Sequence, residues 1–131
     1  MHAQAQLVSG VDFVPLPTRD LERAVEFYGA TLGLEQSVYM PERQYAEFQT
    51  GNLTLSVIVP DAMGIPYNTS ANAIALHVDD VGEARATLEG RGVEFAADTL
   101  DTGVCHMAFF TDPDGNALML HHRYAPRATS A

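Results

Sequence analysis

Apolar residues near the start of the chain change from a strand pattern to a helical one. Val11–Leu16 is an apolar stretch of strand length, and Asp20 follows it. An aspartate at this place can accept hydrogen bonds from the free amides at the start of a helix. Beyond it, apolar residues keep one helical face, and Gly33 can end the helix in the left-handed conformation; they are Leu21, Ala24, Val25, Tyr28 and Leu32. The pattern predicts a strand and then a helix with Asp20 as its N-cap.

The same order returns when the chain is shifted by sixty residues. The superposed pairs are Val14–Leu16 over Ile74–Leu76, Asp20 over Asp80, and Ala24 over Ala84. In the second copy the predicted strand is Ala73–Val78 and the predicted N-cap is Asp80. Val81, Ala84 and Leu88 continue the helical face, which Gly90 or Gly92 can end.

Three further strand signals follow each predicted helix. They are Gln36–Met40, Gln44–Gln49 and Leu53–Val59 in the first half, and Glu94–Ala96, Cys105–Thr111 and Ala117–His122 in the second. Gly51–Asn52 and Asp112–Gly115 have the residues that hairpin turns require. Each half therefore reads strand, helix, strand, strand, strand.

These elements predict an α+β fold in a single domain over residues 1–131. It has two βαβββ modules at about residues 10–59 and 73–124, joined by a Pro-containing linker at 60–72. The tail from residue 125 onward is expected to fray. Two half-sheets, each with one main helix on its outer face, leave their inner faces free to curl around a cleft.

Composition and charge narrow the range of partners. The chain has 131 residues, 47% of them hydrophobic and 18% charged, which is ordinary for a globular protein. Seventeen acidic against seven basic side chains give a net charge of −10, which repels a phosphate backbone and anionic lipid. No apolar run approaches the roughly 20 residues of a membrane-spanning helix. Neither nucleic acid nor a membrane is an expected partner.

The single cysteine, Cys105, cannot form an intrachain disulfide or a thiolate zinc cage. Adjacent strand residues point to opposite faces, so Cys105 and His106 are not a nucleophile and base pair. We expect a buried structural thiol. A reducing compartment agrees with this cysteine use, and the first residues lack the basic and apolar regions of a signal peptide. A cytoplasmic location is the expectation.

Three motifs in this order and spacing give the chain a resemblance to a known family. They are Asp20–Tyr28 followed by Leu32–Leu34, then Val78–Val81, then Phe110–Asn116. Over about residues 10 to 124 the chain resembles the vicinal oxygen chelate superfamily. That superfamily includes glyoxalase I, bleomycin and fosfomycin resistance proteins, and extradiol dioxygenases. The resemblance implies two modules around a ligand-binding cleft and a homodimer, but the scaffold hosts many activities, so it does not define one.

In metal-using members, His, Gln or Glu ligands come from the first and last strand of each half. The resemblance places these positions at Phe13, Ser56, Ala73 and Met119. A phenyl ring, a neutral hydroxyl, a methyl group and a thioether cannot replace the imidazole or carboxylate donors of such a cation. We therefore expect neither a bound metal nor another cofactor.

Strand alternation selects the side chains that line the cleft. The predicted ligand-binding set is Phe13, Tyr45, Glu47, Thr54, Ser56, His77, Met107, Phe109, Met119 and His121. The set contains no Lys or Arg and suits a hydrophobic or aromatic molecule. Glu47 and His77 are its candidates for proton transfer, although a solvated carboxylate and a polar group on the rim are the plainer interpretations. His106 and His122 fall on the other face.

Three functions remain open at this point. The first is a metal-independent protein that binds a hydrophobic or aromatic natural product by sequestration, as bleomycin-binding relatives do, and so confers antibiotic resistance. The second is a metal-independent isomerase or lyase that uses Glu47 or His77. The third is a metal-dependent glyoxalase or dioxygenase, against which the four replaced ligand positions argue. Turnover separates the first from the second, because a binding protein leaves its ligand unchanged.

Overall fold

The computed structural model describes residues 6–126, in which the strands form two separate four-stranded sheets. The first sheet has the order β1-β4-β3-β2, and the second has the order β5-β8-β7-β6. The elements are β1 (Phe13–Pro17), α1 (Leu21–Glu26), β2 (Glu35–Met40), β3 (Tyr45–Gln49), β4 (Thr54–Ile58), β5 (Ile74–His77), α2 (Val81–Gly90), β6 (Leu100–Asp101), β7 (Cys105–Thr111) and β8 (Ala117–Arg123). In each sheet the first strand pairs in parallel with the last strand of its module, and the other pairs are antiparallel. The predicted α+β class and the two βαβββ modules are confirmed, with the two sheets separate within one chain.

Both helices begin as the sequence predicts. The Asp20 side chain accepts a hydrogen bond from the Arg23 N–H at 3.0 Å, and Asp80 accepts one from the Glu83 N–H at 2.9 Å. Each bond satisfies an amide that has no partner within its helix. The two helices then bury their apolar faces against the sheets through Leu21, Ala24, Val81 and Leu88.

The first helix ends in a way that the sequence did not reveal. Residues Phe27–Thr31 form one π-helical turn, and Gly33 then takes a φ of 76°. The wider turn is closed by a hydrogen bond from the Leu32 N–H to the Phe27 carbonyl at 2.9 Å. It leaves the Tyr28 side chain fully buried. Irregular turns of this kind are often retained where a side chain must be aimed.

One predicted strand, Glu94–Ala96, is wrong. Within it, only Phe95 forms a bridge, to Phe110, and the fourth strand of the second sheet is β6, a few residues later. One backbone hydrogen bond, from the Ala96 N–H to the Phe109 carbonyl at 2.9 Å, and two side-chain contacts anchor this segment. The Phe95 ring lies 5.1 Å from the Phe110 ring, and the Arg85 guanidinium lies 4.7 Å from the Phe95 ring.

The predicted strand Cys105–Thr111 matches β7 at both ends, and the other strand predictions differ from the structure by one or two residues at their ends. The largest difference is at β1, which begins at Phe13 although the apolar stretch begins at Val11. The tail predicted from residue 125 lies, beyond residue 126, outside the described residues.

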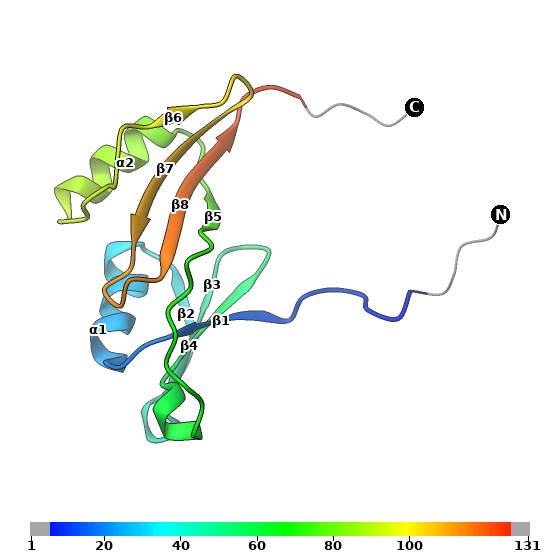
Figure 1. Ribbon diagram of the computed structural model, residues 1–131, viewed down its shortest axis with the longest axis vertical. Helices are drawn as coiled ribbons and strands as arrows, with labels where there is room; N and C mark the ends of the chain where they lie inside the picture. Colours follow the sequence, from blue (N-terminus) through cyan, green and yellow to red (C-terminus); the bar gives the residue numbers. More distant parts are fainter. Residues whose placement is uncertain (1–5, 127–131) are drawn as a thin grey trace.

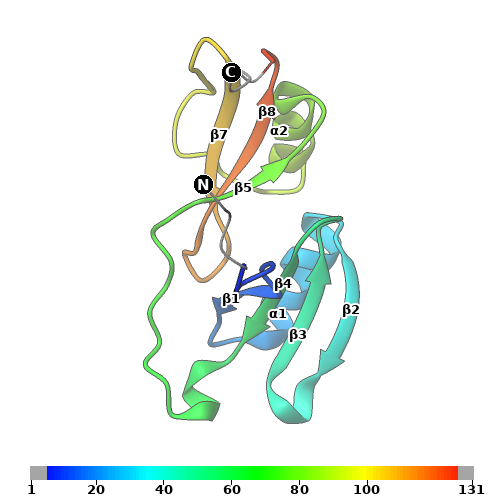
Figure 2. The ribbon, with the colours of Figure 1, turned by 90° about the vertical axis from the view of Figure 1, so that its right-hand side faces the viewer.

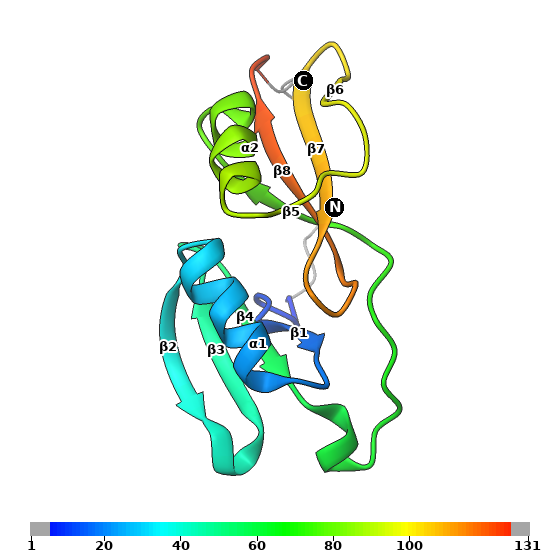
Figure 3. The same cartoon turned by 90° about the vertical axis from the view of Figure 1, so that its left-hand side faces the viewer.

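The hydrophobic core lies between each sheet and its helix. In β3 and β4 the side chains of Ala46, Phe48, Leu55 and Val57 are buried, and their sequence neighbours Tyr45, Glu47 and Gln49 are half-buried. Figure 3 shows α1 and α2 covering the same side of the molecule. From the opposite side, Figure 2 shows the strands with no helix in front of them. Each sheet therefore has one covered face and one open face.

The turn between β7 and β8 joins the two modules. Asp112 is buried, and one of its carboxylate oxygens accepts a hydrogen bond from the Tyr28 hydroxyl at 2.6 Å. The Asn116 side-chain amide donates to the Pro17 carbonyl at 3.0 Å and to Asp112 at 2.8 Å. The linker is held to the same turn, since the Tyr67 hydroxyl donates to Asp114 at 3.0 Å. Figure 1 shows this turn between α1 and the second sheet.

Two further observations concern the burial of the Cys105 thiol and the search for a membrane-spanning helix. Cys105 is buried, with its Sγ 3.1 Å from the Thr102 Oγ1, which confirms the predicted buried thiol. Among residues 6–126, no helix has the length and apolar character to span a lipid bilayer.

Candidate functional site

The open face of the first sheet carries the predicted residues of module one. Strand register sets Phe13 beside Thr54 and Glu47 beside Ser56. Tyr45 lies two residues from Glu47 on the same strand and shares its face. Phe13 is 50% exposed, so a large apolar ring faces solvent here.

The open face of the second sheet carries the other five predicted residues. His121 lies between His77 and Met107 in register, and Phe109 lies beside Met119. A pocket of about 470 Å³ lies over part of this face and is lined by Ala73, Phe109 and Met119 among others. The polar residues of this group lie at one end of the face, and the pocket at the other end is mainly apolar.

The chain does not bring these two groups together. They belong to separate sheets whose open faces point to the same side of the molecule (Figure 2). The faces therefore lie next to one another, and neither covers the other. Glu47 and His77, the two candidates for proton transfer, are on different sheets.

The sequence prediction left out two residues that lie on the open faces. Pro15 is beside Ser56 in register, and Ala75 is beside Met119. Ala73, by contrast, lies immediately before β5. The period of two residues that selected Phe13 also selects Pro15, so the signal was present in the sequence.

The resemblance to metal-using members places their four ligand positions at Phe13, Ser56, Ala73 and Met119. None offers an imidazole or a carboxylate, and Ser56, the polar member, is 4% exposed. Throughout residues 6–126, no three His, Cys, Asp or Glu side chains are grouped so that they could hold a metal ion. This donor set does not fit the divalent cation of the metal-using members.

His77 lies at the rim of the second open face. Its Nε2 is 3.5 Å from the Asp79 Oδ1, and its ring centroid is 5.8 Å from that of His122. The His77 side chain is 70% exposed, so this pair is largely solvated. A contact of this length between exposed side chains contributes little to stability.

The groups with perturbed pKa values belong to contacts outside the predicted set. Burial, and then the charge of Asp112, raises the pKa of Tyr28 above its ordinary value. The Gly103 N–H, followed by the Tyr124 hydroxyl, lowers the pKa of Asp101. These shifts arise from burial, nearby charge and structural hydrogen bonds, and the groups concerned lie outside the predicted ligand-binding set.

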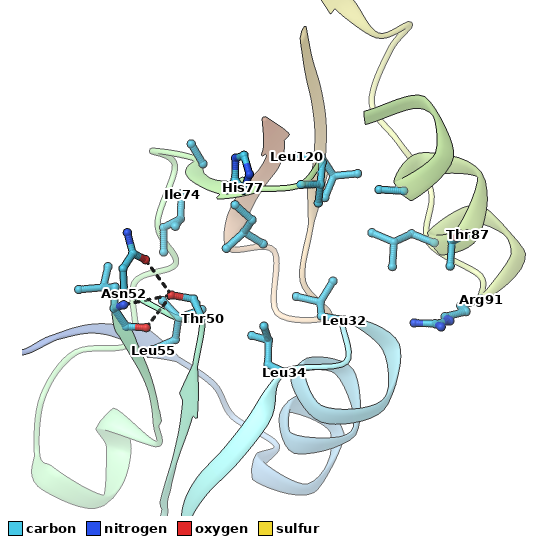
Figure 4. A pocket seen from close by; sticks show the side chains of 16 residues that line it. Leu32, Leu34, Thr50, Asn52, Leu55, Ile74, His77, Thr87, Arg91 and Leu120 are labelled. Atoms are coloured by element: carbon cyan, nitrogen blue, oxygen red, sulfur yellow. Dashed lines mark hydrogen bonds between the residues drawn. The ribbon is translucent and has the colours of Figure 1, made fainter. Parts of the chain in front are cut away.

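A second, larger pocket of about 570 Å³ lies between the modules (Figure 4). Its walls come from the end of the first helical segment, the β3–β4 turn, β5 and α2. Leu32, Leu34, Ile74 and Leu120 are among its apolar lining residues, and Arg91 lies at one side. Of the predicted ligand-binding set, this pocket contains His77.

Paired βαβββ modules, each with one open sheet face, define the fold, and comparison with known proteins identifies the family. The sequence profile of the Glyoxalase/Bleomycin resistance protein/Dioxygenase superfamily matches residues 10–120. The chain belongs to this superfamily. Among curated protein sequences, none matches it.

Solved structures of similar proteins extend over nearly the whole chain. TnmS3, an antibiotic binding protein from Streptomyces sp. CB03234, has a TM-score of 0.76 and 25% identity, covering 91% of this chain and 99% of its own. A glyoxalase family protein from Bacillus anthracis has a TM-score of 0.77 and 23% identity, covering 92% and 99%. Lactoylglutathione lyase from Agrobacterium tumefaciens has a TM-score of 0.76 and 19% identity, covering 88% and 95%. At under 25% identity, the last two show the shared fold alone.

Proposed function

We propose that this chain is a metal-independent, cytoplasmic binding protein that sequesters a hydrophobic or aromatic small molecule, such as a toxic natural product. The observation that carries the proposal is the chemistry of the four side chains at the positions that the family resemblance assigns to metal ligands. Apolar groups, Phe13 and Met119 above all, replace the donors that a metal would need. The centre of the cleft then favours burial of apolar surface and disfavours charge.

Simple energetics supports this ligand class. Apolar surface removed from water contributes roughly 25 cal/mol per Å², before the cost of ordering the ligand. A charged group enters such a site at a high cost unless an opposite charge meets it. The predicted set contains no Lys or Arg, so a phosphate or small dicarboxylate would find no cation there. The similarity to TnmS3, itself described as an antibiotic binding protein, agrees with this proposal.

The proposal includes a homodimer. In one chain, the open faces of both sheets are uncovered and point the same way (Figure 2). A second copy can place the open face of its second module opposite the first module of its partner, and the twofold symmetry forms two such clefts. Each cleft would then combine Phe13, Tyr45 and Glu47 of one chain with the five predicted residues of the other.

A thermal-shift panel tests the ligand class. Flat aromatic and polyene compounds should raise the melting temperature of the purified protein more than fosfomycin or methylglyoxal–glutathione adducts do, because only the first group gains from apolar burial. If only the small anionic compounds raise it, the proposed ligand class is wrong.

Analysis of the recovered ligand separates binding from catalysis. After prolonged incubation with a stabilising compound, mass spectrometry and chromatography should return that compound unchanged. A product of equal mass would indicate an isomerase, and fragments would indicate a lyase. Glu47→Gln and His77→Gln would then show which candidate moves the proton.

A further inference from the structure

The larger pocket between the modules is lined mainly by leucine and other aliphatic side chains. Its volume of about 570 Å³ is within the usual range for small-molecule sites. Leu32 and Leu34 of the first module and Leu76 of the second are only partly buried, so part of each apolar side chain is uncovered in the pocket. The smaller pocket over Phe109 and Met119 shares no lining residue with it. The larger pocket is therefore a separate apolar hollow.

Polar groups lie at the two ends of this pocket (Figure 4). Thr87 and Arg91 are at one end, and Thr50 and Asn52 are at the other. Thr87 and Arg91 are four positions apart at the end of α2, so they lie on the same side of this helix. Leu34 lies between the two ends. The pocket thus has an apolar middle and a cationic end, which is the layout that fits an amphipathic molecule.

The guanidinium of Arg91 is held at the pocket and has no acidic partner. Its Nη1 donates to the Thr31 carbonyl at 2.8 Å, and this bond leaves most of the guanidinium N–H donors available. Arg19, Arg23 and Arg85 each lie 3.3–3.5 Å from a carboxylate oxygen. Among residues 6–126, no carboxylate oxygen lies within 4.0 Å of Arg91, and no Asp or Glu lines the pocket. In a chain with a net charge of −10, this pocket therefore offers a local site for an anion.

We propose that this pocket binds an amphipathic carboxylate, with the carboxylate on Arg91 and an alkyl chain along the leucine side chains. A guanidinium pairs with a carboxylate through two parallel hydrogen bonds, which selects this head group over a neutral or cationic one. The inference goes beyond the proposed function, because the pocket is separate from the cleft that the open faces would form. Since both modules supply its walls, a bound carboxylate should also hold the modules together and raise the melting temperature.

A series of alkyl compounds tests the proposed chemistry on the unmodified full-length protein. In calorimetric titrations at fixed salt, decanoate should bind at least about tenfold more tightly than 1-decanol, and decylamine should bind more weakly than either. Affinity should rise several-fold from hexanoate to octanoate and again to decanoate, because each added CH₂ buries more apolar surface. Equal affinity for the three head groups, or no dependence on chain length, would overturn the proposal.

Substitution of Arg91 tests its contact with the carboxylate. Arg91→Gln should weaken decanoate binding at least about tenfold and leave 1-decanol binding unchanged, because only the carboxylate uses the guanidinium. Arg43→Gln is the matched control, since Arg43 is exposed, lies outside the pocket lining and removes the same charge. Its affinity for decanoate should equal that of the parent. Unchanged decanoate affinity in Arg91→Gln would show that Arg91 only joins the modules through Thr31, and would refute the proposal.

Cysteine labelling locates the bound compound. Thr87 is exposed on α2 and lines the pocket, so Thr87→Cys in a Cys105→Ser background presents a thiol there. Saturating decanoate should slow the reaction of this thiol with a maleimide several-fold. Glu22→Cys, at an exposed position of α1 outside the pocket, is the control and should react at the same rate with and without decanoate. If decanoate does not protect Thr87→Cys, it binds elsewhere and the proposal is wrong.

Cross-tests of two variants separate this inference from the proposed function. Met119→Glu, on the open face, should leave decanoate affinity unchanged, and Arg91→Gln should leave the affinity for aromatic or polyene compounds unchanged. Loss of decanoate binding in Met119→Glu would place decanoate on the open face and refute this inference alone. Failure of every aromatic and polyene compound to bind would refute the proposed ligand class and leave the decanoate result standing. A decrease in decanoate affinity as the protein concentration rises would show that a second copy covers the pocket, which also contradicts the inference.

Discussion

The hydroxyl of Tyr28 joins the two modules, and Tyr28→Phe removes it while keeping the ring. Tyr28 is fully buried, and its hydroxyl donates to the Asp112 carboxylate over 2.6 Å. The ring packs 5.2 Å from the Phe27 ring and 5.9 Å from the Phe48 ring, so phenylalanine preserves these contacts. The substitution therefore isolates a single hydrogen bond between the π-helical turn and the β7–β8 turn.

The expected loss of stability depends on the hydrogen-bond donors that Asp112 retains in the Tyr28→Phe variant. Three other donors still reach its carboxylate, namely the Asp114 N–H at 3.0 Å, the Asn116 N–H at 2.9 Å and the Asn116 side-chain amide at 2.8 Å. A buried hydrogen bond to a charged group contributes about 1.5–3 kcal/mol, and the remaining donors limit the penalty for the oxygen that loses one. We expect Tyr28→Phe to lower the free energy of unfolding by about 2 kcal/mol. This corresponds to a loss of about 8 °C in melting temperature for a chain of this size.

Urea unfolding at pH 8 measures this difference. Tyr39→Phe is the matched control, because Tyr39 is 43% exposed on β2, and its free energy of unfolding should stay within about 0.5 kcal/mol of the parent. If the two variants have equal stability, the hydrogen bond between the modules does not contribute as argued.

The free energies of unfolding of the parent and of Tyr28→Phe should also respond differently to high pH. Burial, and then the charge and hydrogen bond of Asp112, raises the pKa of Tyr28 well above its ordinary value of 10.0. As the pH rises through about 10, the unfolded chain loses the Tyr28 proton while the folded chain keeps it. This contribution to stability is thus complete below pH 10 and declines above it. The difference between the parent and Tyr28→Phe should narrow by about 1 kcal/mol between pH 8 and about pH 11. A constant difference would contradict the raised pKa.

Three further predictions concern helix capping and metal content. Asp20→Ala and Asp80→Ala should each lower the free energy of unfolding by about 1 kcal/mol without changing ligand affinity, because each loses one capping hydrogen bond; loss of binding with unchanged stability would instead place these carboxylates in a site. Protein purified without chelator should contain no stoichiometric divalent metal, and close to one Ni, Zn, Fe or Mn per chain by elemental analysis would refute this. Adding EDTA should leave the melting temperature unchanged, since no metal-binding energy is lost; a decrease of several degrees would show that a metal stabilises the fold.

Local features of the fold could be predicted because their causes are local in sequence. The caps at Asp20 and Asp80 follow from residue type and position just before an apolar helical face. The alternation that placed Glu47 and Ser56 on the same face is also a property of neighbouring positions along each strand. The prediction of a strand at Glu94–Ala96 was wrong because this segment pairs with β7 at a single bridge, Phe95 to Phe110, and the sequence cannot show how far backbone pairing extends.

Features that depend on distant residues could not be predicted. The segment Asp112–Gly115 was interpreted as a hairpin turn, which it is, but Asp112 also accepts a hydrogen bond from Tyr28, 84 residues away. Nothing in the spacing of either residue indicates this contact. The orientation of the two open faces is equally invisible in the sequence, because it depends on how the modules pack. The ten predicted residues therefore identify two faces, and their assembly into one cleft is part of the proposal.

Calorimetric titration of Met119→Glu tests the central claim most directly. Met119 lies on the open face of β8, beside Ala75 and Phe109. The family resemblance assigns a metal-ligand position to this residue. The titrant is the aromatic or polyene compound that most stabilises the parent, and Met119→Leu is the control that keeps the site apolar. If the cleft binds by apolar burial, Met119→Leu should retain affinity within a few-fold, and Met119→Glu should lose at least about tenfold, because the ligand would have to desolvate a carboxylate. Equal affinity of Met119→Glu and the parent would contradict the account.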